Sequence, residues 1–223
     1  MPGEIGERLN AVRAGLPPRV KLVAVSKFHP VEDIEEAVAA GQTVFGENRP
    51  QELMQKAHHF EGRGLEWHFI GHLQTNKLKM VLPYASLVQS VDSLHLLEEI
   101  NAWGSREGRV IPVLLELHIA AEESKQGFYE EEILDILFRA ESFKNISFRG
   151  LMGMATNTDC EDDIRADFGR IRAFMDYLQD LFPELEGFSE LSIGMSGDWH
   201  IALEFGATIV RIGTAIFGPR AIR

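Results

Sequence analysis

Lys27 is the first residue whose position in the chain asks for a chemical explanation. It ends a short apolar, β-branched run, residues 20–27, that predicts a buried strand. Because side chains alternate across a strand, Val23, Val25 and Lys27 share one face. A lysine at the carboxyl end of a buried strand can form an imine with an aldehyde or ketone when burial or a nearby cation keeps its amine neutral. The alternative is a lysine that pairs with a carboxylate or reaches solvent.

Two glycine-containing segments near the end of the chain have the composition of an anion site. Gly194 to Asp198 follows a predicted strand and opens a helix, where glycines admit an anion close to the backbone and Ser196 offers a hydroxyl. Gly213 and Thr214 follow the last predicted strand and add a backbone N–H and a second hydroxyl. Barrels commonly build a phosphate site from the loops after strands seven and eight. Alternatively, Ser196 is an ordinary helix N-cap and Gly213 serves barrel closure.

Arg211 lies on the last predicted strand and shares a face with Ile209 and Gly213. If Gly213 faces a ligand, the guanidinium points into the mouth of the barrel, where it needs an acceptor. A pyridine nitrogen or a carboxylate of the ligand can supply one. A structural pair with Glu116 or another carboxylate of the barrel is the alternative.

Asn48 and His72 follow the second and third predicted strands and either contact a planar ligand or brace Lys27. Helix capping or hydrogen bonding at the rim is the alternative for each. Glu47 is read as a first-turn acid favoured by the helix dipole. The residues expected in the core or barrel wall are Trp67, Met152, Met154 and Trp199.

The elements that must position these residues alternate between strand and helix with short links. Strands are predicted at residues 20–27, 43–45, 66–70, 86–91, 110–117, 146–152, 190–193 and 207–212, and a short helix at residues 4–12 precedes them. Such alternation predicts parallel pairing through right-handed crossovers. Eight strands in a chain near the ~250 residues typical of the fold favour one closed (β/α)₈ TIM barrel with an extra N-terminal helix. We expect residues 1–223 to form one domain.

Composition excludes several classes of function. The chain carries a net charge of −12, which disfavours nonspecific binding to nucleic acid or an anionic membrane. Its single cysteine, Cys160, cannot form an intrachain disulfide, and no Cys/His cluster has the spacing of a metal site. The N-terminus has no apolar signal core, and no stretch reaches the ~20 apolar residues of a membrane span. We therefore expect a cytoplasmic protein that binds no metal, and we expect it to be a monomer.

A resemblance to a known family is carried by stretches that run in order from Lys21 to Gly218. They read KLVAVSKFHP, VFGENRPQEL, WHFIGHLQTNK, VQSVDS, ESKQGF, GLMGMA and LSIGMSGDWHIALEFGATIVRIGTAIFG. The set resembles the pyridoxal 5′-phosphate homeostasis protein family, a single-domain relative of the alanine racemase N-terminal barrel. The chain departs from the family pattern at Gly197, at Trp199 with its neighbour His200, and at Arg49, to which no role is assigned.

The resemblance implies a barrel that binds pyridoxal 5′-phosphate as an imine with Lys27. It also implies that Ser196, Gly213 and Thr214 hold the phosphate and that Arg211 faces the pyridine nitrogen. Asn48 and Met195 would lie near the cofactor, and His72 is retained as a candidate contact from the rim. An arginine that donates to the pyridine nitrogen keeps it unprotonated, which weakens the ring as an electron sink.

Three functions are compatible with this pattern. The first is a protein that holds, stores or delivers pyridoxal phosphate, with apoenzymes that require it as candidate partners and without dedicated turnover. The second is an amino-acid racemase, which needs an acid or base on each face of the substrate carbon. The related racemases take the second base from another domain, which we do not expect in this chain. The third is an imine-forming aldolase, in which Arg211 would have no purpose.

Overall fold

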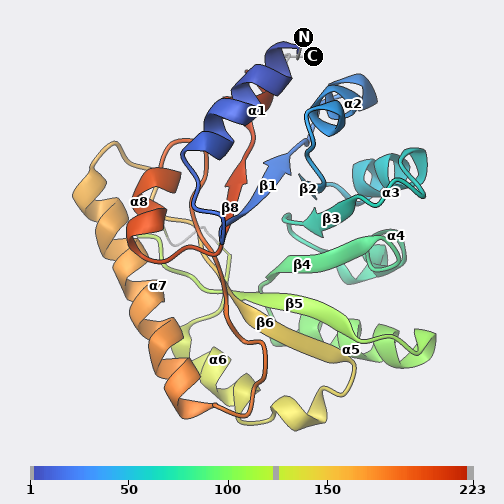
Figure 1. The fold of residues 1–223 in the computed structure, drawn as a ribbon. Coiled ribbons are helices and arrows are strands. Elements are labelled where there is room, and N and C mark those ends of the chain that lie inside the picture. The colour runs from blue at the N-terminus through green and yellow to red at the C-terminus, as the bar shows by residue number, and fades with distance from the viewer. Residues whose placement is uncertain (1–2, 123–125, 220–223) are drawn as a thin grey trace.

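Eight parallel strands close into a barrel in the computed structural model, which describes residues 3–122 and 126–219 (Figure 1). The strands are β1 (Lys21–Val25), β2 (Val44–Glu47), β3 (Glu66–Phe69), β4 (Ala85–Val91), β5 (Ile111–Glu116), β6 (Ile146–Met152), β7 (Glu190–Ser192) and β8 (Ile209–Ile212). Each strand pairs with its neighbours in chain order, and β1 also pairs with β8. The predicted (β/α)₈ barrel is therefore confirmed.

Helices cover the outside of the barrel. They are α1 (Glu4–Ala14), α2 (Val31–Ala39), α3 (Pro50–His59), α4 (Leu78–Val81), α5 (Leu94–Glu107), α6 (Glu130–Leu137), α7 (Glu161–Leu181), α8 (Trp199–Glu204) and α9 (Thr214–Phe217), with single 3₁₀ turns η1 (Thr75–Lys77) and η2 (Ala140–Ser142). The helices of the described residues are each too short or too polar to traverse a lipid bilayer.

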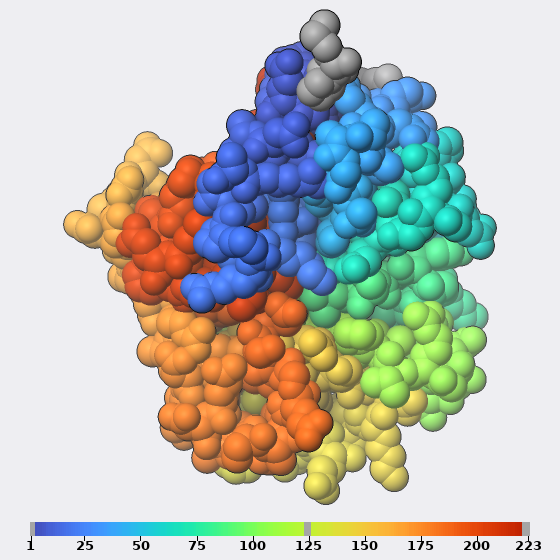
Figure 2. Space-filling view, in the orientation of Figure 1, coloured from blue at the N-terminus to red at the C-terminus, as the bar shows by residue number. Residues whose placement is uncertain are grey.

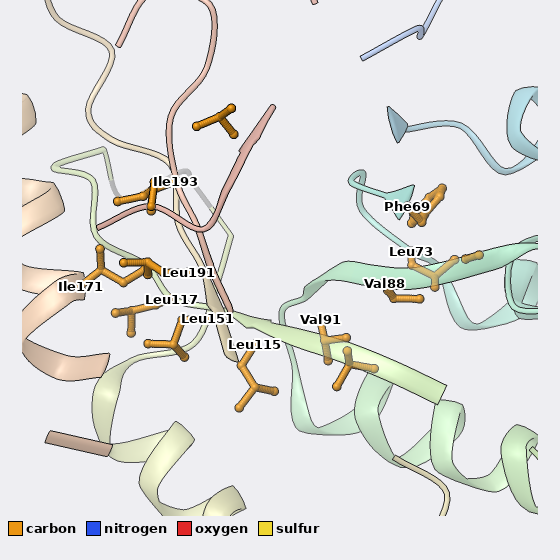
Figure 3. Close-up of a cluster of buried hydrophobic side chains, with 14 of the residues drawn as sticks. Phe69, Leu73, Val88, Val91, Leu115, Leu117, Leu151, Ile171, Leu191 and Ile193 are labelled. Atoms are coloured by element: carbon orange, nitrogen blue, oxygen red, sulfur yellow. The ribbon is translucent and has the colours of Figure 1, made fainter. Parts of the chain in front are cut away.

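The alternation of side chains along the strands divides the apolar residues between two regions. Inside the barrel lies a small cluster formed by Val23, Val44, Leu87, Leu114, Met152 and Ile209. The neighbouring residue Leu115 points to the opposite face and joins the larger core between strands and helices. Figure 3 shows Leu151 and Leu191 of this outer core gathered near Ile171 of α7. Burying each such side chain stabilises the fold by roughly 1.5–3 kcal/mol.

The extra N-terminal helix α1 is confirmed and packs along α9 and α2. Its buried residues Ile5, Leu9 and Val12 recur at helical spacing on one face. The carboxylate of Glu36 on α2 accepts the backbone N–H of Ile5 at 2.7 Å, because helix-start N–H groups have no partner within the helix. In Figure 2 the blue α1 lies between the red C-terminal part of the chain and the lighter blue α2. The helix thereby joins the first and last units of the barrel.

Two helix ends differ from the sequence-based expectation. The sequence pattern predicts one helix over about residues 130–143, but α6 ends at Leu137 and the separate turn η2 follows it. The sequence also predicts a helix that ends at Trp103, but α5 continues to Glu107, where Gly108 at φ +64° forms a left-handed cap. Both differences lie away from the carboxyl ends of the strands and leave the barrel order unchanged.

Gly150 of β6 provides a test of this barrel. Its φ is +145°, and a Cβ added there would lie 1.9 Å from the carbonyl oxygen of Glu190 on β7. We expect Gly150→Ala to lower the free energy of unfolding in urea by about 2 kcal/mol or more, since both backbone strain and overpacking oppose the methyl group. Gly197→Ala is the control, because a Cβ there meets no atom within 4 Å. Equal unfolding free energies for the two variants would contradict the β6–β7 register.

Candidate functional site

The predicted site residues gather at one end of the barrel. Because all strand pairs are parallel, the carboxyl ends of the strands form a single rim. Directly after β1, β2, β3, β7 and β8 follow the predicted residues Lys27, Asn48, His72, Met195, Ser196, Gly213 and Thr214, and Arg211 lies on β8.

Lys27 is partly buried in a turn, two residues beyond the end of β1. The prediction that the strand extends through Lys27 is wrong. The backbone turns after Val25, and the N–H of His29 donates to the carbonyl oxygen of Ser26 at 3.0 Å. Phe28 has φ +67°, a left-handed conformation that costs a non-glycine residue about 1–3 kcal/mol. The lysine is therefore presented by a tight turn rather than by the pleat of a strand.

Ser196 joins the loops after β7 and β8. Its hydroxyl oxygen accepts the backbone N–H of Gly213 at 3.2 Å and that of Ala215 at 3.4 Å. The alternative that Ser196 is a helix N-cap is wrong, because Asp198 occupies the N-cap, whereas the helix predicted to follow the segment Gly194 to Asp198 is present. Helix α8 begins at Trp199, after Asp198. The structure thus brings a hydroxyl and two backbone N–H groups together; both N–H groups donate to the hydroxyl oxygen in this structure, and groups of these kinds also suit a phosphate.

The loop after β7 keeps its shape through its own contacts. The carboxylate of Asp198 accepts the N–H of Met195 at 2.5 Å. Gly194 has φ +92°, and a Cβ there would lie 2.7 Å from the Cβ of Ala202. Gly197 faces open space, so its departure from the family pattern leaves the cradle intact. Trp199 is buried in the core, as predicted.

The loop cradle lies next to the strand that leads to Lys27. Val23 pairs with Arg211, and the register continues toward Gly213. A Cβ added at Gly213 would lie 3.1 Å from the carbonyl oxygen of Val25, so no larger residue fits this close approach without displacement. The turn that carries Lys27 and the cradle around Ser196 therefore occupy adjacent positions on the rim.

Arg211 is buried inside the barrel mouth and is held by the carboxyl ends of β6 and β7. Its Nη1 donates to the carbonyl oxygen of Ser192 at 2.8 Å and to the Ser192 hydroxyl at 2.6 Å. Its Nη2 donates to the carbonyl oxygen of Gly153 at 3.0 Å. These bonds fix the guanidinium and leave Nε without a partner among the described residues. The alternative of a direct ion pair with Glu116 is wrong; that carboxylate acts on Arg211 only through its charge.

A chain of buried polar side chains extends from Arg211 across the barrel and was missed from the sequence. The Ser192 hydroxyl donates to Oε1 of Gln89 at 2.6 Å, and Nε2 of Gln89 lies 2.7 Å from Nδ1 of His68. Burial, followed by the charge of Lys21, lowers the pKa of His68 to about 3. His68 is consequently neutral and accepts from Gln89. Its signal in the sequence is a polar residue between two aromatic ones, Trp67 and Phe69.

Glu116 and His72 belong to an acidic part of the rim. Burial, then the negative charge of Asp92, raises the pKa of Glu116 to about 7, against the opposing charge of Arg211. Nδ1 of His72 lies 2.8 Å from the Asp92 carboxylate, and the His72 side chain is half exposed. Contact of His72 with a ligand stays a prediction.

Asn48 carries a buried polar atom that lacks a partner. Its Oδ1 finds no hydrogen bond among the described residues. The backbone of Gly71 approaches Asn48 so closely that an added Cβ would lie 2.3 Å from the Asn48 carbonyl oxygen. A buried amide oxygen without a partner is costly, so a ligand donor at this point would relieve it.

Glu47 is not the helix-dipole acid that the sequence predicted. It ends β2, is fully buried, and its Oε1 accepts from the Ser26 hydroxyl at 2.6 Å and from Nζ of Lys56 at 2.7 Å. Burial raises the pKa of Glu47, although Lys56 and Ser26 oppose the shift. Glu47 and Lys56 are therefore part of the surroundings of the Lys27 turn that sequence reasoning missed.

Cavity size does not locate this site. A cavity of about 790 Å³ lies beside the turn after β1 and is lined by residues such as Phe28, His29 and Phe217. Another, of about 560 Å³, lies between the loops after β6 and β7 and includes Met195. No His/Cys/Asp/Glu group in the described ranges could hold a metal ion. Residues 123–125 of the predicted ESKQGF motif lie outside the described residues.

Fold and rim together define a class of protein. The family model described as "Alanine racemase, N-terminal domain" matches residues 3–221. Alanine racemase from Clostridium difficile 630 superimposes with a TM-score of 0.76 over 96% of this chain and 55% of its own, at 16% identity, so this likeness concerns the fold alone.

Closer relatives narrow the class. A pyridoxal phosphate homeostasis protein from Vibrio alginolyticus is 38% identical over 92% of this chain and 88% of its own length. The structure of PipY from Synechococcus elongatus PCC7942 with PLP bound is 36% identical, with a TM-score of 0.88 over 96% of this chain and 100% of that one. The chain therefore belongs to the pyridoxal phosphate homeostasis protein family.

The raised pKa of Glu116 predicts a pH dependence of stability. The native protein holds a proton on Glu116 up to about pH 7, whereas the unfolded chain releases it near 4.5, the ordinary pKa of a glutamate side chain. Stability contributed by this proton is present below pH 4.5 and is lost as the pH rises to about 7. Relative to wild type, Glu116→Gln should therefore gain up to about 3 kcal/mol in unfolding free energy between about pH 5 and about pH 8.

Urea unfolding of the ligand-free protein at both ends of this pH range measures the gain. Glu131→Gln, at an exposed position on α6, is the control and should show the pH slope of the wild type. Identical slopes for Glu116→Gln and wild type would contradict the raised pKa.

Proposed function

We propose that this chain binds pyridoxal 5′-phosphate as an imine with Lys27 and acts in intracellular pyridoxal phosphate homeostasis without dedicated catalytic turnover. The observation that carries the proposal is the adjacency of the Lys27 turn and the Ser196–Gly213 cradle on one rim. The names of the relatives and the PLP-bound PipY structure support it.

The residues at the rim fit a phosphorylated pyridine aldehyde. An amine is present at Lys27, and the Ser196 hydroxyl with the backbone N–H groups of Gly213 and Ala215 supplies donors for a phosphate. The hydroxyl of Thr214 is exposed beside them. Oδ1 of Asn48, which has no hydrogen-bond partner in the described part of the chain, lies at the same rim. We propose that Met195 and His72 border the ring from either side of this arrangement.

Lys27 would hold the aldehyde carbon of the cofactor through its amine in the neutral form, with loss of one molecule of water. No oxidant or reductant is consumed, so the reverse reaction with water returns free aldehyde and amine. Reversibility of this kind suits a protein that stores and delivers its ligand.

Arg211 would affect how strongly bound pyridoxal phosphate can act as an electron sink. When bound, pyridoxal phosphate supplies an electron sink, whose strength depends on the protonation of its pyridine nitrogen. The guanidinium only donates hydrogen bonds, and after the bonds to Ser192 and Gly153 its Nε–H and one N–H of Nη2 remain without an acceptor among the described residues. We propose that Nε faces the pyridine nitrogen and keeps it unprotonated, which weakens the sink.

The racemase alternative is less well supported. Two-base racemisation needs an acid or base on each face of the substrate carbon, and Lys27 supplies one. The relatives at 38% identity are named homeostasis proteins, whereas the likeness to alanine racemase at 16% identity carries the fold only. We therefore favour holding of the cofactor over turnover. We also propose that residues 1–223 form one monomeric domain in the cytoplasm and that the recipients are apoenzymes that require pyridoxal phosphate.

Substitution of Lys27 tests the imine directly. We expect Lys27→Ala to lose the visible absorbance of the imine formed with added pyridoxal phosphate and to retain its circular dichroism spectrum, because the lysine lies in a surface turn. Lys21→Ala, at the opposite end of β1 and exposed, is the matched control and should keep the absorbance. An adduct that borohydride still traps in Lys27→Ala would refute the assignment.

The phosphate cradle is tested by comparing two ligands. The double variant Ser196→Ala with Thr214→Val should weaken binding of pyridoxal phosphate by roughly 100-fold or more, since each of the two lost hydrogen bonds to a charged group contributes about 1.5–3 kcal/mol. Binding of pyridoxal, which lacks the phosphate, should change less than threefold.

Equilibrium titration of each ligand, followed by absorbance, gives both affinities. Ser86→Ala is the control, because its hydroxyl donates to the Trp67 carbonyl oxygen near the start of β4. Equal losses for the two ligands would place the anion site elsewhere.

A further inference from the structure

One face of α3 contacts the turn that carries Lys27. Arg49, at the N-cap of this helix, Glu52 and Lys56 are spaced three and four residues apart and therefore lie on the same side. Each of the three reaches residues of the turn after β1. No function is yet assigned to these side chains.

Lys56 forms the buried part of this contact. Its Nζ donates to the carbonyl oxygen of Ser26 at 2.8 Å, to Oε1 of Glu47 at 2.7 Å and to Oε2 of Glu52 at 3.4 Å. The side chain is 7% exposed, and that of Glu47 is fully buried. The Ser26 hydroxyl donates to the same Oε1 of Glu47. Lys56 thus binds the backbone carbonyl of Ser26, the residue that precedes Lys27, and Glu47 binds the Ser26 side chain.

A buried ion pair of this kind needs an explanation other than stability. The desolvation of both charges offsets much of their attraction, so apolar residues at the same positions often stabilise a fold as well or better. What such a pair does provide is directional hydrogen bonding at a fixed place. Here the fixed place is the backbone carbonyl of Ser26, one residue before Lys27.

Glu52 and Arg49 hold the other side of the turn. The backbone N–H of Phe28 donates to Oε2 of Glu52 at 2.8 Å. The guanidinium of Arg49 lies over the Phe28 ring, 4.4 Å from its centroid, and also pairs with Glu52. Phe28 has φ +67°, a conformation that a phenylalanine keeps only where its surroundings impose it. Contacts from Arg49, Glu52 and Lys56 therefore hold the residues on both sides of Lys27, and we call this set of contacts the clamp.

We propose that Glu47, Glu52 and Lys56 are positioning residues that hold the Ser26–Phe28 turn so that the amine of Lys27 faces the Ser196–Gly213 cradle. This inference rests on the proposed function and extends it to residues that touch no ligand. It also assigns a role to Arg49, whose guanidinium packs on the Phe28 ring. A side chain that only supported the fold would affect every ligand alike, whereas a clamp on the lysine affects the covalent bond alone.

Pyridoxamine 5′-phosphate separates these two roles, because it carries the phosphate and ring but has no aldehyde for Lys27. In Glu52→Ala, which removes the acceptor of the Phe28 N–H, we expect the affinity for pyridoxal phosphate to fall about tenfold. The affinity for pyridoxamine phosphate should stay within twofold of wild type. Fluorescence titration of each ligand gives both values.

A second variant protects the test against misfolding. Glu47→Gln combined with Lys56→Met removes both buried charges at once, so that neither is left unpaired, and should show the same divergence between the two ligands. Lys21→Met is the matched control, since its ammonium pairs with Glu66 at the other end of β1. Parallel losses of both affinities in Glu52→Ala, or no loss of either, would overturn the proposal.

A readout without any ligand separates this proposal from the proposed function. In the ligand-free protein, the Phe28 amide should exchange with deuterium at least tenfold faster in Glu52→Ala than in wild type, while the amides of β1 keep their rates. Unchanged exchange at Phe28 overturns the clamp. Borohydride mapping of the wild-type complex to a lysine other than Lys27 would instead overturn the imine assignment, and the exchange result would still decide whether the clamp exists.

Discussion

Closure of the barrel between β1 and β8 is the constraint on which the rest of the site depends. Lys27 and Gly213 are separated by almost the whole chain, and no local preference brings them together. The parallel pairing of β1 with β8, with Val23 opposite Arg211, places the segments that follow the two strands side by side. Gly213 then lies so close to Val25 that an added Cβ would be 3.1 Å from the Val25 carbonyl oxygen. The relative position of Lys27 and Gly213 at the rim is therefore a consequence of the β1–β8 pairing that closes the barrel.

Polar residues inside the barrel are arranged around Arg211. The hydrogen bonds from Ser192 through Gln89 to His68 run in one direction, which fixes the orientation of each side chain. Burial lowers the pKa of Arg211 to about 10, so the guanidinium remains charged near neutral pH. The pKa of Glu116 is raised to about 7, so this carboxyl is partly protonated near neutral pH. The Arg211 guanidinium is therefore a hydrogen-bond donor at the mouth of the barrel that keeps its proton when it meets a ligand. In the proposed function, this donor holds the pyridine ring and weakens it as an electron sink.

The order of the strands and the residues at their carboxyl ends were predictable from the sequence. For β6, both the first and the last residue were predicted correctly. Apolar alternation and turn residues are local signals, and parallel closure follows from their repetition. The sequence did not allow the hydrogen-bond partners of individual polar residues to be predicted. Nothing near Glu47 in the sequence shows that Lys56 returns to it from α3, and Ser196 resembled an N-cap because its partner Gly213 lies on another loop. His68 carried a usable signal, since it is a polar residue between Trp67 and Phe69 in β3.

The central claim is that one phosphorylated aldehyde touches both Lys27 and the loops after β7 and β8. A crystal structure of the chain grown with pyridoxal 5′-phosphate measures this most directly. We predict electron density that is continuous from the nitrogen of Lys27 to the ligand, with the phosphate within hydrogen-bond distance of Ser196 and the backbone N–H of Gly213. Density for the ligand on another lysine, or a phosphate bound away from these two loops, would contradict the account.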